Sequence, residues 1–162
     1  MNRFEVGSVF RWDDFPDPRI SSSVIKPRWF VYLGETGALS QVKTAHFCTT
    51  TTQAHHFGPG GVRQKHDVIR FQKGSAPFDA DCILDCDEPP YSDALQKLEN
   101  EKNIEVKGRL PEQTMRHIYN RLLSSEGYSY MVLSDIHHSF NMAGIVGLKK
   151  PNNECRGVLP KG

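Results

Sequence analysis

The sequence predicts a small, mainly β domain with helical structure near its C-terminus: a strongly bent antiparallel sheet or half-open barrel, closed by a C-terminal helix. Two observations predict this fold class. Five or six short segments rich in aromatic and β-branched residues are bounded by Gly, Pro or acidic residues, as strands usually are. One segment in the C-terminal third has apolar residues at helical spacing. This pattern by itself does not distinguish one kind of small β-barrel from another.

The clearest predicted strand covers residues 28–33, which are mostly aromatic or β-branched and lie between Pro27 and Gly34. A turn at 35–38 leads into a second strand at 41–50, and the two are expected to form a hairpin. A long loop rich in Gly and His follows at 52–66, and residues 92–98 have the composition of one or two helical turns. The other predicted strands cover residues 7–12, 68–71, 82–85 and 104–108.

The predicted helix runs from Pro111 to Ser124, with proline in its first turn, where it is tolerated, and Gly127 beyond its end. Residues 128–140 are ambiguous, with a second short helix as one interpretation. The helix carries an apolar face made of Met115, Ile118, Tyr119, Leu122 and Leu123.

The composition is that of an ordinary globular protein. The chain has 162 residues, 38% apolar and 24% charged, which fits one domain over residues 1–150 and a loose tail at 151–162. Its longest apolar run, residues 29–33, is far shorter than the roughly 20 residues that cross a membrane. The N-terminus, MNRFEVGS, has no apolar stretch of signal-peptide length, so a cytoplasmic location is expected. In that compartment the four cysteines are expected to be free thiols.

Charge is distributed unevenly along the chain. Residues 1–75 carry ten Lys/Arg and six Asp/Glu, a net +4, whereas residues 76–162 carry ten and thirteen, a net −3. Eight carboxylates lie between Asp79 and Glu101. One interpretation is a surface that attracts a polyanion beside one that repels it, and the other is an ordinary mixed surface.

Five short motifs follow one another in an order that is known from one protein family. They are GSVF (7–10), KPRWFV (26–31), FCTT (47–50), CILDCD (82–87) and KGRLPEQTM (107–115). The first, second, third and fifth resemble, in that order, the "G-D-[IV]-[VYW]", "R-P-x-L-V-V", "P-L-T-[ST]" and "x-G-x-L-S-x-x-x-[ML]" motifs of the MazF/PemK toxins. The fourth motif lies where those proteins have a strand before an acidic turn. The chain departs from the family in having Lys26 for the arginine of "R-P" and Phe47-Cys48 for "P-L".

This resemblance implies an SH3-like barrel, a homodimer, and an endoribonuclease toxin that cleaves single-stranded RNA without a metal or other cofactor. It also implies an antitoxin protein that covers the RNA groove. In such cleavage the RNA's own 2′-OH attacks the adjacent phosphate and leaves a 2′,3′-cyclic phosphate. The protein has to supply a base, an acid and fixed positive charge.

Five residues are candidates for this chemistry. Lys26 and Arg28 are the candidate cations, and Thr49 matches the family threonine that is expected to contact the scissile phosphate. His55 and His56 lie in the long loop and are candidates for proton transfer, because imidazole titrates near neutral pH. The competing interpretations are solvated strand-edge cations, an ordinary strand threonine and a surface loop.

Further residues of the same regions are candidates for RNA binding. Trp12 and Phe57 adjoin loops and could stack on unpaired bases, and Gly60 would let backbone N–H groups approach a phosphate. Thr51, Arg63 and Lys65 complete this set. Two alternatives stay open: a barrel of the same kind that binds a protein or nucleic acid without catalysis, and a metal-dependent nuclease that uses the histidines. No His-x₃-His or Cys-x₂-Cys spacing occurs, so no metal ligands are predicted.

Overall fold

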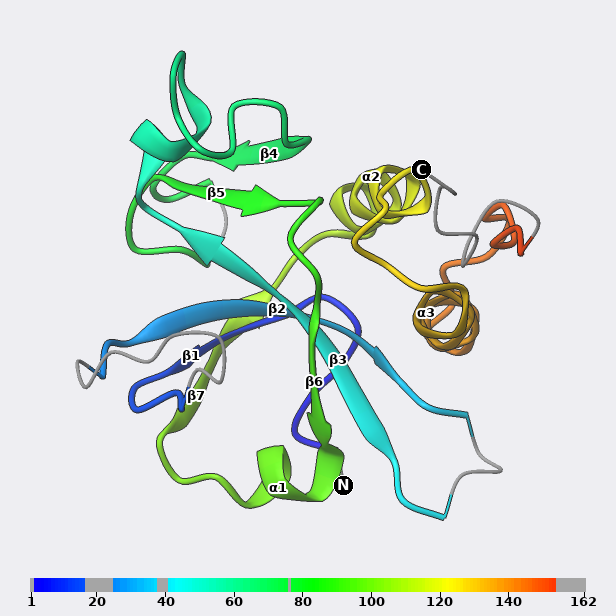
Figure 1. Ribbon diagram of the computed structural model, residues 1–162. Coiled ribbons are helices and arrows are strands. Elements are labelled where there is room, and N and C mark those ends of the chain that lie inside the picture. The colour runs from blue at the N-terminus through cyan, green and yellow to red at the C-terminus, as the bar shows by residue number, and fades with distance from the viewer. Residues whose placement is uncertain (1, 17–24, 38–40, 76, 154–162) are drawn as a thin grey trace.

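The computed structural model describes residues 2–16, 25–37, 41–75 and 77–153 (Figure 1). Cys155, Ala38, residues 19–24 of the loop before Arg28 and residues 154–162 of the predicted tail lie outside this part. Seven strands, three α-helices and one 3₁₀ helix are present in it. They are β1 (Ser8–Trp12), β2 (Arg28–Glu35), β3 (Thr44–Thr51), η1 (Ala54–Phe57), β4 (Val68–Phe71), β5 (Cys82–Asp85), β6 (Tyr91–Ala94), α1 (Leu95–Asn100), β7 (Ile104–Arg109), α2 (Glu112–Leu123) and α3 (Tyr130–Met142).

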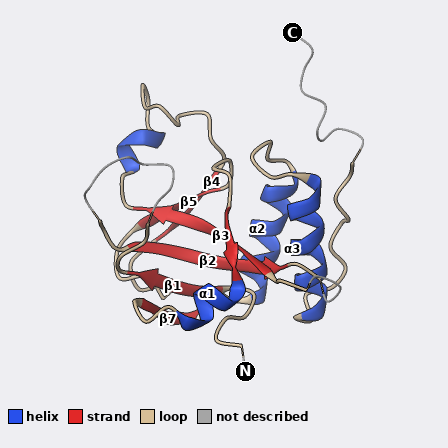
Figure 2. Cartoon of the chain, turned by 60° about the horizontal axis from the view of Figure 1, so that its bottom comes forward, coloured by secondary structure: helices blue, strands red, loops and turns tan. Residues whose placement is uncertain are grey.

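The strands form one antiparallel sheet in the order β4-β5-β3-β2-β1-β7, with β6 added to β3 (Figures 1 and 2). Strand β3 is long enough to pair with β6 through Thr44–Phe47 and with β5 through Thr50 and Thr51. The mainly β, antiparallel fold class is therefore confirmed. The described strands do not close into a barrel, because β4 and β7 end the sheet without pairing with each other. Helices, and not further strands, cover one face of the sheet.

The central strands are buried on both faces. In β2, Phe30 and Tyr32 point into an aromatic cluster, while Val31 and Leu33 point into a second cluster. This explains why residues 29–33 form a continuous apolar run rather than an alternating pattern. The aromatic cluster contains Phe4, Phe10, Trp12, Phe15, Phe30, Tyr32, Phe47 and Tyr91, with several ring pairs edge to face.

Two helices, α2 and α3, pack on the other face of the sheet. The predicted apolar stripe of α2 is confirmed, with Met115, Ile118 and Tyr119 buried in the second cluster. The ambiguous segment at 128–140 forms α3, whose N-cap Ser129 accepts a hydrogen bond from the Val132 N–H. The chain beyond α3 returns along the helices, where Tyr119 Oη donates to the Lys149 carbonyl at 2.5 Å.

One local prediction was wrong in its first half. Residues 91–94 form strand β6 rather than the start of a helix, and only 95–100 are helical. The reason is tertiary, since β6 pairs with β3 over its whole length. Strand β2 also extends to Glu35 through a register shift at Gly34, whose φ of +148° favours glycine.

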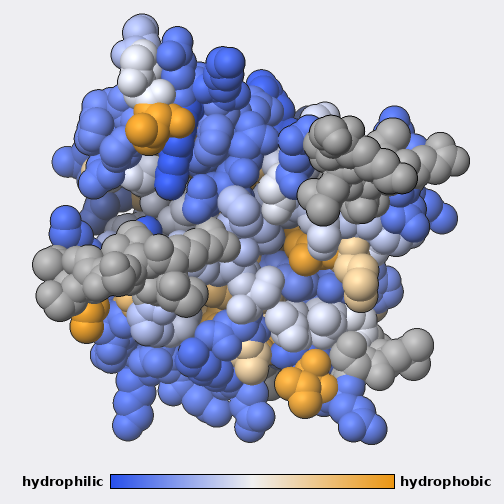
Figure 3. All heavy atoms as spheres, viewed as in Figure 1, coloured by the Kyte–Doolittle hydropathy of each residue, from blue (hydrophilic) through white to orange (hydrophobic). Residues whose placement is uncertain are grey.

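The face seen in Figure 3 is mostly hydrophilic, with apolar residues in small separate patches. None of the helices in the described part of the chain has the length and apolarity needed to span a membrane.

Candidate nucleic-acid-binding groove

The hairpin register brings the start of β2 beside the end of β3. Trp29 lies opposite Thr50 and Phe30 opposite Thr49. The KPR segment at 26–28 and the run of threonines at 49–52 are therefore neighbours in space although they are well separated in sequence. This end of the hairpin is the first wall of a groove.

The long loop supplies a second wall. It starts with η1, and its return is fixed by the Arg63 N–H, which donates to the His56 carbonyl at 2.8 Å. Gly61 permits this close approach, because a Cβ at that position would lie 2.4 Å from the same carbonyl oxygen. Phe57 is only 7% exposed, and it is the residue through which η1 is buried in the domain. His56 Nε2 lies 2.8 Å from Gln53 Oε1, and this contact holds the imidazole ring near the start of the loop.

Between these walls lies a groove of about 510 Å³. Six of the residues predicted from sequence line it, from three separate segments of the chain. They are Lys26, Arg28, Thr49, Thr51, His56 and Arg63.

Five predicted residues do not line the groove. His55 packs against His56 with ring centroids 4.1 Å apart and is exposed on the outside of the loop. The Gly60 N–H already donates to Gln64 Oε1 at 3.1 Å, and Lys65 is exposed elsewhere on the loop. Trp12 and Phe57 are buried, at 1% and 7% exposure, so neither presents a ring face to a base.

Trp29 is a groove-lining aromatic residue that the sequence pattern places in the core. It is half-buried, lines the groove and packs on Phe78 at 5.9 Å between centroids. Lys107 Nζ lies 6.0 Å from its ring centroid, within the range of a cation–π contact. A tryptophan in an apolar strand is ordinarily core, but position 29 lies at the open end of the hairpin.

A buried carboxylate fixes the loop to the turn after β5. Asp85 is 1% exposed, and its Oδ2 lies 2.7 Å from His66 Nδ1 and 3.5 Å from Arg63. Its Oδ1 accepts the N–H groups of Asp87 and Glu88 at 3.0 and 3.2 Å. A buried carboxylate is tolerable only with such partners, so Asp85 determines where Arg63 lies in the groove.

The groove carries charges of both signs. Lys26, Arg28 and Arg63 provide three cations, and Asp79 and Glu88 provide two carboxylates at its rim. Arg63 also lies 3.5 Å from Glu88. Phosphate oxygens prefer such guanidinium and ammonium donors, and the carboxylates limit how much polyanion the groove attracts.

Of the three cysteines in the described ranges, Cys82 lines the groove. Burial raises the pKa of its thiol to about 11, despite a hydrogen bond with Thr50 that lowers it. The thiol is therefore protonated near neutral pH and is a poor nucleophile. Cys48, Cys82 and Cys86 are free thiols. Within the described ranges, no group of three or more His, Cys, Asp or Glu side chains is arranged to hold a metal ion.

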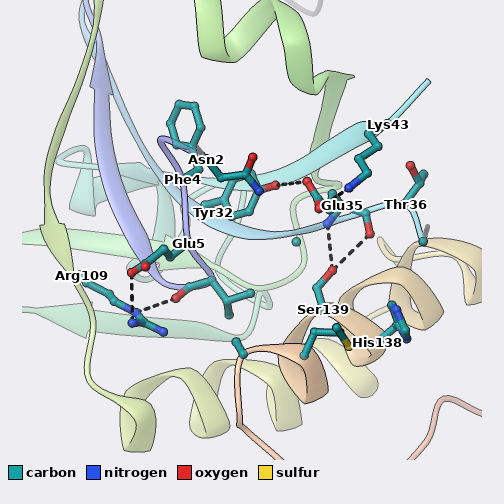
Figure 4. Close-up of a pocket in the computed structure, with 15 residues that line it drawn as sticks. Asn2, Phe4, Glu5, Tyr32, Glu35, Thr36, Lys43, Arg109, His138 and Ser139 are labelled. Carbon is teal, nitrogen blue, oxygen red and sulfur yellow. Dashed lines mark hydrogen bonds and ion pairs between the residues drawn. The ribbon is translucent and has the colours of Figure 1, made fainter. Parts of the chain in front are cut away.

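A second cavity, of about 400 Å³, lies between the N-terminal segment, the end of β2 and α3 (Figure 4). Several of its polar groups are paired with one another. Glu35 accepts hydrogen bonds from Tyr32 and Lys43, both at 3.3 Å, and Arg109 donates to Glu5 at 3.1 Å. Burial and the Glu35 charge raise the pKa of Tyr32, so its hydroxyl remains a donor. The first groove is therefore the candidate functional site.

Comparisons with known protein families, with curated proteins and with solved structures find no match to this chain.

Proposed function

We propose that the groove binds single-stranded RNA and cleaves it without a metal, by attack of the RNA's 2′-OH on the adjacent phosphate. The observation that supports this proposal best is the convergence of Lys26, Arg28, Thr49, Thr51, His56 and Arg63 on one groove. These residue types are the cations, hydroxyls and imidazole that the reaction requires, and they come from segments that only the fold brings together.

The cations would hold the phosphate and stabilise its developing charge. Arg28 presents a guanidinium that can bind two phosphate oxygens at once, and exposed Lys26 offers an ammonium beside it. Arg63 is kept in position by Asp85. Fixed donors of this kind commonly contribute factors of about 10² to 10³ in rate each.

His56 is the proposed base. It would take the proton of the 2′-OH while the oxygen attacks phosphorus, and the 5′-oxygen would leave with a proton from Lys26 or the solvent. The products are a 2′,3′-cyclic phosphate and a 5′-hydroxyl, and no water is consumed. Proton transfer contributes roughly 10² to 10⁴ in rate.

Trp29 would receive an unpaired base next to the scissile phosphate. Stacking on an aromatic side chain contributes roughly 1–3 kcal/mol per base. The resemblance to MazF/PemK toxins supports the same activity, and with it we propose a homodimer and an antitoxin partner that covers the groove.

A second candidate function is non-catalytic binding of a protein or nucleic acid through the same groove. It is favoured by Arg63, which is already close to two carboxylates, Asp85 and Glu88. Such a site would bind a phosphate less tightly than three unpaired cations, and it would not need a base.

The test is incubation of the full chain with a long single-stranded RNA, with and without EDTA, followed by mapping of the cut ends. The variants are Lys26→Ala/Thr49→Ala, His56→Ala, and the control Lys102→Ala/Thr114→Ala, which removes the same two side-chain types outside the groove. We expect EDTA-resistant cuts with 2′,3′-cyclic phosphate ends that persist in the control and fall at least tenfold in both groove variants. Intact RNA with folded wild-type protein would contradict cleavage. RNA retention that the groove variants alone lose would then favour the binding function.

A further inference from the structure

A serine, a histidine and an aspartate form a hydrogen-bonded chain on the opposite half of β3 from the RNA groove. His46 lies on β3, Ser92 directly opposite it on β6, and Asp135 on α3, which packs on that face of the sheet (Figure 1). His46 Nδ1 is 2.7 Å from Ser92 Oγ, and His46 Nε2 is 2.9 Å from Asp135 Oδ2. Three elements therefore place a hydroxyl, an imidazole and a carboxylate in line.

The partners determine the direction of the hydrogen bonds. A carboxylate only accepts, so Nε2 must carry the proton that it donates to Asp135. In the neutral imidazole Nδ1 is then the acceptor, and Ser92 donates its hydroxyl proton to it. This is the arrangement of an activated hydroxyl: a base within hydrogen-bond distance of the nucleophile, oriented by a third group.

The three hydrogen-bonded side chains differ in exposure as such chemistry requires, with the nucleophile exposed and the base buried. Ser92 is exposed, whereas His46 is 4% exposed and lies behind it. The Asp135 side chain is 27% exposed. A substrate, and the water that later hydrolyses the acyl-serine, can therefore reach the serine hydroxyl, and the base lies directly behind it.

The strand register adds a donor for a developing oxyanion. The Leu95 N–H donates to the Lys43 carbonyl, which identifies the odd-numbered residues of β6 as those whose backbone groups face β3. The N–H of Ser92 consequently points to the outer edge of β6, a strand that pairs with β3 alone in the described part of the sheet. Backbone N–H groups beside the nucleophile are the usual stabilisers of a tetrahedral oxyanion.

We propose that Ser92, His46 and Asp135 form a second site, which transfers acyl groups from carboxylic esters to Ser92 and then to water. Ser92 Oγ attacks the ester carbonyl carbon and its proton moves to His46 Nδ1. The alkoxide leaves with that proton as an alcohol, and water then releases the acid and restores the serine. Met131 is 77% exposed one helical turn before Asp135, and it offers apolar contact to the acyl chain.

The same contacts would also fasten α3 to the sheet, so the test must distinguish reactivity from fastening. The full-length chain is treated with a fluorophosphonate, which reacts when a serine oxygen displaces fluoride from phosphorus and the proton passes to the adjacent base. The modified peptide is located by mass spectrometry. Hydrolysis of a p-nitrophenyl ester is followed in parallel, and circular dichroism checks the fold of each variant.

We expect labelling at Ser92 that is lost in Ser92→Ala and retained in Ser124→Ala, which removes another exposed serine hydroxyl. Asp135→Asn should remain folded and label at least tenfold more slowly, because the amide no longer stabilises the imidazolium. RNA cleavage by the groove should be unchanged in Ser92→Ala, so the two proposals succeed or fail separately. Folded wild-type protein that does not react at Ser92, or an Asp135→Asn variant that reacts at the wild-type rate, would overturn the assignment.

Discussion

Replacement of Asp85 by Asn isolates the contacts that hold the long loop against the sheet. The two oxygens of Asp85 have different partners. Oδ1 accepts hydrogen bonds from the N–H groups of Asp87 and Glu88. Oδ2 lies against the basic side chains of His66 and Arg63. Asparagine can keep the first pair of bonds through its carbonyl oxygen. The second oxygen becomes an NH₂ group without the negative charge that faces the two basic side chains.

The magnitude follows from the lost contacts. A hydrogen bond to a charged group is worth about 1.5–3 kcal/mol, which applies to the 2.7 Å contact with His66. The 3.5 Å contact with Arg63 is longer and half-exposed, so it adds up to about 1 kcal/mol. We expect Asp85→Asn to lower the free energy of unfolding by about 2–4 kcal/mol.

The assay is urea unfolding at neutral pH, with Asp81→Asn as the control. Asp81 is exposed and accepts one backbone N–H, that of Lys73, so its replacement should cost less than about 1 kcal/mol. Equal effects of the two substitutions, or a loss below about 1 kcal/mol for Asp85→Asn, would refute the role of Asp85 as the anchor of the loop.

Three further predictions concern stability. Gly34→Ala should lower the melting temperature in a thermal scan, because its Cβ would lie 2.5 Å from Ser139 Cβ at a φ of +148°; full stability in this variant would contradict the close approach of α3. Ser129→Ala should cost about 1 kcal/mol in urea unfolding, because it removes the acceptor for the Val132 N–H at the start of α3, and no loss would mean that the cap contributes nothing. Raising the pH should also destabilise the protein, because burial raises the pKa of Cys86 from 9.0 to about 12. The thiol of the unfolded chain ionises at lower pH than the buried thiol, so the stability present below pH 9 is lost as the pH approaches 12. The free energy of unfolding should fall by up to about 1.4 kcal/mol per pH unit. Cys86→Ala should make this decline shallower, and an unchanged slope would contradict the prediction.

Elements with a local signal were predictable. Strands β4 and β5 have the predicted bounds, and α2 follows from the apolar spacing of its residues. Strand β6 was not predictable, since residues 92–98 have helical composition and only pairing with β3 makes the first of them extended. The open sheet likewise depends on where the helices pack, which no segment reveals by itself.

The same distinction applies to the candidate site. Lys26, Arg28 and Thr49 were singled out by their positions in the KPRWFV and FCTT motifs, and the hairpin register of β2 and β3 places these motifs side by side. The aromatic residues were assigned the wrong way round: Trp12 adjoins a loop, but Phe15 folds back onto its ring at 5.0 Å, while Trp29 in the clearest strand faces the groove. The contact between His46 and Asp135 joins β3 to α3, and no spacing in the sequence indicates it.

The positions of the two tryptophans have a practical consequence for spectroscopy. Trp12 is enclosed by other aromatic rings at 1% exposure, so its fluorescence should be emitted at short wavelength and change only on unfolding. Trp29 borders the groove and has a lysine ammonium beside its ring, which makes its emission sensitive to whatever enters. A Trp12→Phe chain would carry a single tryptophan, Trp29, at the candidate site. Titration of that chain would then give a binding curve without an attached dye.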